Sequence, residues 1–138
     1  MKNFSSEQPL ILLIEEKQDL LHELRSVLGS ANYATCCCTS AQSALAAVEE
    51  TPPALIISAT SLNSESGLEL CERIKQRPGL EAVPVMFLSS GQISDIIRRH
   101  DPLGGTYYLR KPLDPNVLLE LVDKALHTPT LAAHTFQT

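Results

Sequence analysis

Five short apolar runs punctuate the chain, and they alternate with stretches in which apolar residues recur at a longer spacing. The runs are Leu10–Ile14, Tyr33–Cys38, Ala54–Ser58, Val83–Leu88 and Thr106–Leu109. None of them carries a charged side chain, and the first is apolar throughout, which is typical of a strand covered on both faces. Pro84 stands near the beginning of the fourth run, where a strand tolerates a proline. The pattern predicts five β-strands.

Between the runs, apolar residues recur every three or four positions, which is the spacing of one face of a helix. The apolar faces of the five predicted helices begin at Leu20, Ala44, Leu68, Ile93 and Val117. Ser40 and Asp114 stand before the second and fifth helices, where their side-chain oxygens can cap the first turn. Pro115 fits that first turn because its ring fixes a helical backbone angle.

Strands that alternate with helices predict an α/β fold, in which helices cover both faces of a parallel sheet. We expect one domain over residues 9–127, a polar lead at 1–8 and a flexible tail at 128–138. In such sheets, ligands bind beyond the carboxyl ends of the strands. Those ends fall at Glu15–Glu16, at 59–61, at 89–90 and at 110–112, and a polar loop is expected at 60–66.

The formal net charge of −5 argues against a nucleic-acid surface, because binding to phosphates requires clustered basic residues. The densest basic pairs, Lys75 with Arg77 and Arg98 with Arg99, are typical of solvated helix faces. No apolar run approaches the roughly 20 residues that span a bilayer. The polar start, Met1–Pro9, is unlike a signal peptide. We therefore expect a cytoplasmic protein that binds neither nucleic acid nor a membrane.

The four cysteines, Cys36, Cys37, Cys38 and Cys71, lack the spaced pairs that zinc sites use. On an extended strand, Cys36 and Cys38 share one face and Cys37 points to the other. We expect small buried hydrophobes, with a reactive thiol or an adventitious metal site as the alternative. The histidines have no ligand spacing and are predicted to lie on the surface. They are His22, His100, His127 and His134.

Polar residues and a glycine follow four of the predicted strands in a fixed order. Glu15–Glu16 follows the first, Gly67 opens "GLEL" after the third, Ser89 follows "PVMFL", and Lys111–Pro112 follows "YYLR". In order and spacing, this set resembles the CheY-like receiver domain of bacterial response regulators. The resemblance implies a flavodoxin-like (βα)5 sandwich whose parallel sheet has the strand order 2-1-3-4-5.

The chain departs from that family at the end of the third strand. Eight residues before Gly67, where the family has its phosphoaccepting aspartate, stands Ala59. As the resemblance implies, three carboxylates would hold Mg²⁺ there and one would become an aspartyl phosphate. A methyl group provides neither a nucleophile nor a metal ligand. We expect no cofactor, or weak Mg²⁺ binding by Glu15, Glu16 and Ser61. The alternative for Glu15–Glu16 is an exposed pair at a strand end.

The resemblance also assigns roles to the remaining residues of this edge. Lys111 would contact phosphate in a standard receiver, and here we expect it to form a salt bridge to Glu15 or Glu16. The bond before Pro112 is expected to be cis. Ser89 and Tyr108 match the hydroxyl and aromatic switch pair of the family, with an ordinary hydroxyl and a half-buried tyrosine as the alternative.

The leading hypothesis is a phosphorylation-independent protein-interaction module of two-component signalling, and not an enzyme. Its partners would be a histidine kinase or an output protein. They would bind the fourth helix, fifth strand and fifth helix, from Ile93 to Leu126. One alternative is residual phosphoryl transfer to Thr60 or Ser61, which would need an adjacent base. Another is a structural unit that forms a two-fold homodimer through the same face.

Overall fold

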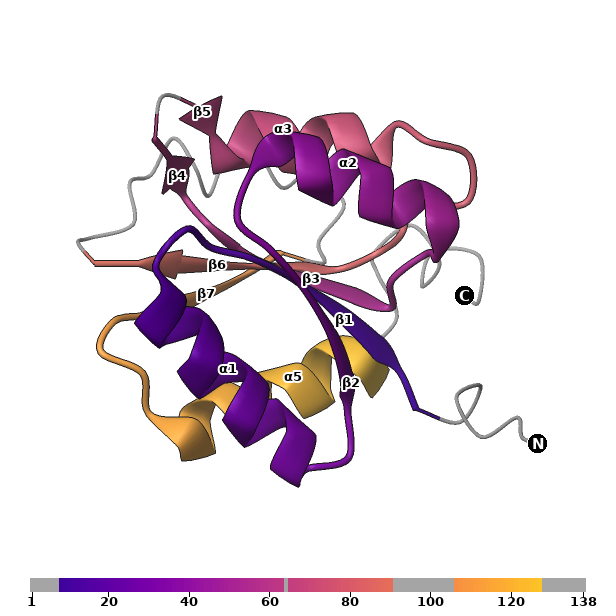
Figure 1. The fold of residues 1–138 in the computed structure, drawn as a ribbon. Helices are drawn as coiled ribbons and strands as arrows, with labels where there is room; N and C mark the ends of the chain where they lie inside the picture. Colours follow the sequence, from indigo (N-terminus) through magenta and orange to yellow (C-terminus); the bar gives the residue numbers. More distant parts are fainter. Residues whose placement is uncertain (1–7, 64, 91–105, 128–138) are drawn as a thin grey trace.

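A parallel sheet in the order β2-β1-β3-β6-β7 forms the centre of the computed structural model (Figure 1). The structure describes residues 8–63, 65–90 and 106–127. The strands of this sheet are β1 (Leu10–Ile14), β2 (Ala34–Cys38), β3 (Leu55–Ala59), β6 (Val85–Ser89) and β7 (Thr106–Arg110). Because β6 and β7 are the fourth and fifth strands of the sheet along the chain, the predicted order 2-1-3-4-5 is confirmed.

Helices cover both faces of the sheet. Helices α1 (Gln18–Ser30) and α5 (Pro115–His127) lie on one face, and α2 (Ala41–Glu50) and α3 (Gly67–Lys75) lie on the other (Figure 1). The predicted caps are confirmed: the Ser43 amide donates to the Ser40 hydroxyl at 3.1 Å, and the Asn116 amide donates to the Asp114 carboxylate at 2.9 Å. None of the helices in the described ranges has the length and apolar character needed to cross a bilayer.

Three parts of the sequence-based prediction fall on residues that the structure does not describe. They are the lead at 1–8 except Gln8, the fourth helix with Ile93, Ile96 and Ile97, and the tail at 128–138.

Alternation along the strands divides the apolar interior into two layers. Leu12 and Ile14 of β1 pack in the layer beneath α2 and α3, whereas Ile11 and Leu13 pack in the layer against α1 and α5. Every residue of β3 and β6 is buried. The carboxyl ends of the parallel strands therefore emerge together at one rigid edge of the sheet.

The loop at 60–66 is more ordered than its polar sequence predicts. Strands β4 (Ser61–Leu62) and β5 (Glu65–Ser66) pair in an antiparallel hairpin, and Leu62 is only 3% exposed. The Gly67 amide, at the start of α3, donates to the Thr60 carbonyl at 2.9 Å. A Cβ atom on Gly67 would overlap the backbone carbonyl oxygen of Ala59. The absence of a side chain at Gly67 thus lets α3 start directly against the end of β3.

We expect Gly67→Ala to lower the free energy of unfolding by about 3 kcal/mol, because the new methyl collides with backbone that cannot move aside cheaply. Urea denaturation measures this loss. Gly29→Ala is the matched control: an added Cβ on Gly29 meets no atom within 4 Å, and alanine in a helix should stabilise by about 0.5–1 kcal/mol. Equal stability of the Gly67→Ala and wild-type proteins would contradict the close approach.

Candidate functional site

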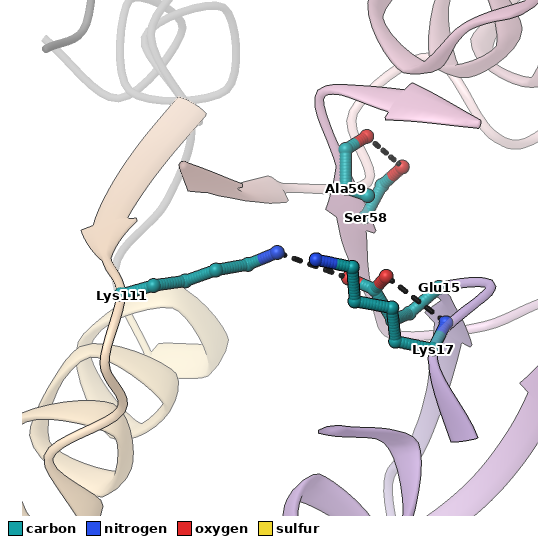
Figure 2. A network of polar contacts seen from close by, with 5 residues as sticks. All are labelled: Glu15, Lys17, Ser58, Ala59 and Lys111. Atoms are coloured by element: carbon teal, nitrogen blue, oxygen red, sulfur yellow. Dashed lines mark hydrogen bonds and ion pairs between the residues drawn. The ribbon is translucent and has the colours of Figure 1, made fainter. Parts of the chain in front are cut away.

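The predicted site residues stand at the carboxyl edge of the sheet. Glu15 follows β1, Ala59 ends β3, Ser89 ends β6, and Lys111 follows β7. The Lys111 side chain extends across this edge, and its Nζ lies 3.5 Å from Glu15 Oε1 (Figure 2). Two strands, β3 and β6, lie between β1 and β7 in the sheet, so the ion pair joins residues that the sheet itself keeps apart.

Glu15 is a buried acid rather than an exposed one. It is 2% exposed, and its Oε2 accepts a hydrogen bond from the Lys17 amide at 3.2 Å. Its own amide donates to the Cys38 carbonyl of β2 at 3.0 Å. The expected salt bridge of Lys111 is confirmed, with Glu15 as its partner. The alternative of an exposed pair is wrong for Glu15, and Glu16 is half-buried.

The end of β3 brings a methyl group to this edge. Ala59 is 4% exposed and pairs with Leu88 of β6. The preceding residue, Ser58, is fully buried, and its hydroxyl donates to the Ala59 carbonyl at 2.8 Å (Figure 2). Thr60 is half-buried and Ser61 is exposed on the hairpin. Because the Ser58 hydroxyl is buried and bonded inside the protein, Thr60 and Ser61 are the next hydroxyls along the chain after this strand.

The two candidate switch residues lie on neighbouring strands. Ser89 is 9% exposed at the end of β6, and its carbonyl accepts a hydrogen bond from the Lys111 amide at 2.8 Å. Tyr108 is half-buried on β7, opposite Phe87, and the two rings stack with centroids 6.2 Å apart. The peptide bond between Lys111 and Pro112 is cis, as expected. Tyr108 therefore packs against the apolar layer that contains Phe87, on the strand next to that of Ser89.

The Mg²⁺ ion that the resemblance implies can be tested against the donor atoms present. Mg²⁺ requires near-octahedral oxygen ligands. Among the described residues, no group of three His, Cys, Asp or Glu side chains could hold a metal ion. Glu15 Oε1 and Glu16 Oε1 are buried without a hydrogen-bond partner, but Glu15 Oε1 faces the Lys111 ammonium. Ser61, the third candidate ligand, is exposed on β4. The residues present do not fit Mg²⁺.

The sequence-based prediction missed Lys17 and a hollow beside the ion pair. This hollow has a volume of about 520 Å³ and lies between the start of α1 and the segment before α5. Its lining residues are Lys17, Gln18, Asp19, Leu20, Glu23, Lys111, Pro112 and Leu113. In Figure 2 the Lys17 side chain runs toward Glu15 and Lys111. The position of Lys17, directly after the acidic pair, was the available signal.

The cysteines do not form a site with these residues. Cys38 and Cys71 are buried and Cys36 is half-buried, but Cys37 is exposed, so the expectation of burial is wrong for Cys37. Burial raises the pKa of the Cys71 thiol to about 12 and that of the Cys38 thiol to about 11, which keeps both protonated near neutral pH. His22 and His127 are exposed as predicted, whereas His100 and His134 lie outside the described residues.

We compared the sequence and the structure with those of known proteins. The chain matches the family model described as "Response regulator receiver domain" over residues 11–123. In fold it is similar to the chemotaxis protein CheY4 of Vibrio cholerae, with a TM-score of 0.80 and 19% identity over 86% of this chain and 99% of that chain. It is also similar to the signal receiver domain of an HD domain-containing protein from Pseudomonas fluorescens Pf-5, with a TM-score of 0.75 and 28% identity over 86% of this chain and 87% of that one.

Among curated relatives, the phosphate regulon transcriptional regulatory protein PhoB of Rhizobium meliloti is 29% identical over 86% of this chain and 52% of its own length. The response regulator protein GraR of Staphylococcus haemolyticus is 29% identical over 79% of this chain and 47% of its own length. The chain thus spans about half the length of these regulators.

We expect Lys111→Met to lower the free energy of unfolding by about 2 kcal/mol, because it leaves the Glu15 carboxylate buried without its counter-charge. The loss should be smaller than for a fully buried pair, since the Lys111 side chain is 22% exposed. Replacing both members, as Glu15→Gln/Lys111→Met, should recover more than half of it. Urea denaturation of the full mutant cycle measures these values, with the exposed Lys124→Met as control. Additive effects of the two substitutions would contradict a direct interaction.

Proposed function

Because the chain belongs to the response regulator receiver domain family, we propose that it is a cytoplasmic protein-interaction domain of two-component signalling that acts without phosphorylation. The proposal depends on one observation. The third strand of the sheet ends in Ala59, eight residues before the glycine that packs against it, and in the family that position carries the phosphoaccepting aspartate. We propose that Ala59 replaces this aspartate and that the domain is not an enzyme.

The chemistry of the edge supports this proposal. Forming an acyl phosphate requires a carboxylate nucleophile, and the alanine methyl is inert toward phosphoryl donors. Glu15, which follows the neighbouring strand β1, has one oxygen bonded to the Lys17 amide and the other facing Lys111. It is 2% exposed, so a phosphodonor in solution has little access to it.

The two hydroxyls near Ala59 are weaker candidates for an acceptor. Thr60 is half-buried and Ser61 is exposed. A hydroxyl becomes a nucleophile only when a base takes its proton. Glu15, the acid that follows the neighbouring strand β1, is buried and its Oε1 already faces Lys111, so it is badly placed to act as that base. Phosphorylation of Thr60 or Ser61 is therefore the outcome that would replace our proposal.

Without phosphorylation, a partner protein must itself select the active-like state of the domain. Moving a two-state equilibrium from 1:99 to 99:1 takes about 5.5 kcal/mol of differential affinity. An interface of ordinary size can supply that amount. We propose that the partner, a histidine kinase or an output protein, binds the face formed by β7 and α5. Val117 of α5, 39% exposed, is the large hydrophobic side chain most available on the described surface.

Treatment with acetyl phosphate and Mg²⁺ should add no mass to the wild-type chain, whereas a phosphoryl group would add about 80 Da. Intact-protein mass spectrometry measures the difference. Ala59→Asp, which restores the acid at this position, is the positive control and should gain the adduct.

An adduct on the wild-type chain would refute the proposal. In that case Thr60→Ala/Ser61→Ala would show whether the hydroxyls carry it. The adduct on Ala59→Asp would establish that the reaction conditions and the folded domain support phosphorylation of an aspartate at this position.

Partner capture from the native cell should depend on the α5 face. We expect Val117→Asp to weaken retention of the captured signalling protein at least about tenfold, since a charge would then be buried in the interface. Ala46→Asp, at another exposed position, on α2, is the control on the opposite face of the sheet. Loss of the partner with Ala46→Asp but not with Val117→Asp would contradict the proposed face. Sedimentation of the same variants tests the alternative of a homodimer.

A further inference from the structure

We infer that Lys111 replaces the divalent cation at this edge of the sheet: its ammonium neutralises Glu15 from within the chain, and the wild-type domain neither needs nor takes up Mg²⁺. The inference deepens the proposed function and rests on it, because it starts from the same methyl at the end of β3. It concerns the charge balance of the site rather than its reactivity.

The first step is that Glu15 requires a cation. Its side chain is 3% exposed, and a carboxylate removed from water is strongly destabilised unless a positive charge or hydrogen bonds compensate it. One backbone amide, that of Lys17, donates to Oε2 at 3.2 Å. Glu15 Oε1 has no hydrogen-bond partner, so its compensation comes from the Lys111 ammonium at 3.5 Å.

The second step is that the chain already supplies the positive and donor groups around Glu15. Its Oε1 faces the Lys111 ammonium and its Oε2 accepts the Lys17 amide, so a Mg²⁺ ion would have to compete with both. At the end of β3, Ala59 offers only its methyl, and its carbonyl oxygen already accepts the Ser58 hydroxyl at 2.8 Å. Glu16 Oε1, which is buried and lacks a hydrogen bond, cannot build an octahedral site alone.

The third step is that two ammonium groups of the chain already stand at this site. Lys111 pairs with Glu15, and Lys17 lines the same hollow as Lys111, together with Asp19 and Glu23. The Lys17 side chain extends from its backbone toward Glu15 and Lys111 (Figure 2). Adding Mg²⁺ would place two further positive charges beside two ammonium groups, which repel it.

The test is thermal unfolding in EDTA and in about 10 mM MgCl₂, with NaCl matched for ionic strength. The wild-type midpoint should move by less than about 1 °C. Lys17→Met/Lys111→Met leaves two acids without internal cations and should gain a Mg²⁺ site. For a Kd of about 1 mM, Mg²⁺ then raises the folding constant about tenfold and the midpoint by about 5 °C. Lys111→Met alone should show a smaller gain, because Lys17 remains.

Two controls separate a site from a general salt effect. Lys75→Met/Lys124→Met removes two lysines outside the hollow and should stay as insensitive as the wild type. Glu15→Gln/Lys17→Met/Lys111→Met removes the acid as well, so it should lose the Mg²⁺ response. If Lys17→Met/Lys111→Met is unfolded in EDTA, refolding by Mg²⁺ in circular dichroism takes the place of the midpoint shift.

A wild-type midpoint that rises by several degrees with Mg²⁺ would overturn the inference, as would a Lys17→Met/Lys111→Met protein that Mg²⁺ neither stabilises nor refolds. Both results are distinct from failure of the proposed function. If the wild-type chain binds Mg²⁺ but gains no phosphoryl adduct, only the inference about Lys111 is refuted. If the chain gains the adduct, the proposed function is refuted, whatever the response to Mg²⁺.

Discussion

The Glu15 carboxylate lies in the interior of the protein, and the arrangement of the site follows from the need to compensate its charge there. It follows a strand next to the centre of the sheet, and its amide is bound to the carbonyl of the adjacent edge strand. This backbone anchor holds the carboxylate below the surface. The positive charge that compensates Glu15 comes from farther along the same edge of the sheet, where the long side chain of Lys111 reaches across β3 and β6.

The parallel topology explains why these two residues can meet. All five strands of the main sheet in the described residues run in one direction, so their carboxyl ends share an edge. Between the strands of Glu15 and Lys111 lie β3 and β6, which end in small side chains, Ala59 and Ser89. The Lys111 side chain extends across the ends of these two strands to reach Glu15 (Figure 2).

Much of this architecture could be predicted from the sequence, because it depends on local patterns. The apolar runs located each strand of the main sheet to within two residues, and Ser40 and Asp114 marked two helix starts. What could not be predicted depends on contacts distant in sequence. The salt bridge of Lys111 was expected from the family resemblance, but the depth at which Glu15 is buried was not. The hairpin was missed because its one apolar anchor, Leu62, is isolated in a polar segment. The burial of Cys37 was predicted wrongly because β2 is an edge strand, which has a neighbouring strand on one side only.

The central claim is that the third strand presents an inert methyl where a receiver domain has its reactive acid. Beryllofluoride with Mg²⁺ tests it most directly, since this reagent forms an acyl-phosphate mimic only on an accessible carboxylate held with a metal ion. In proton–nitrogen correlation NMR spectra, the account predicts that the amide signals of residues 58–67 and of Lys111 keep their positions when the reagent is added. Saturable shifts centred on those residues would contradict it.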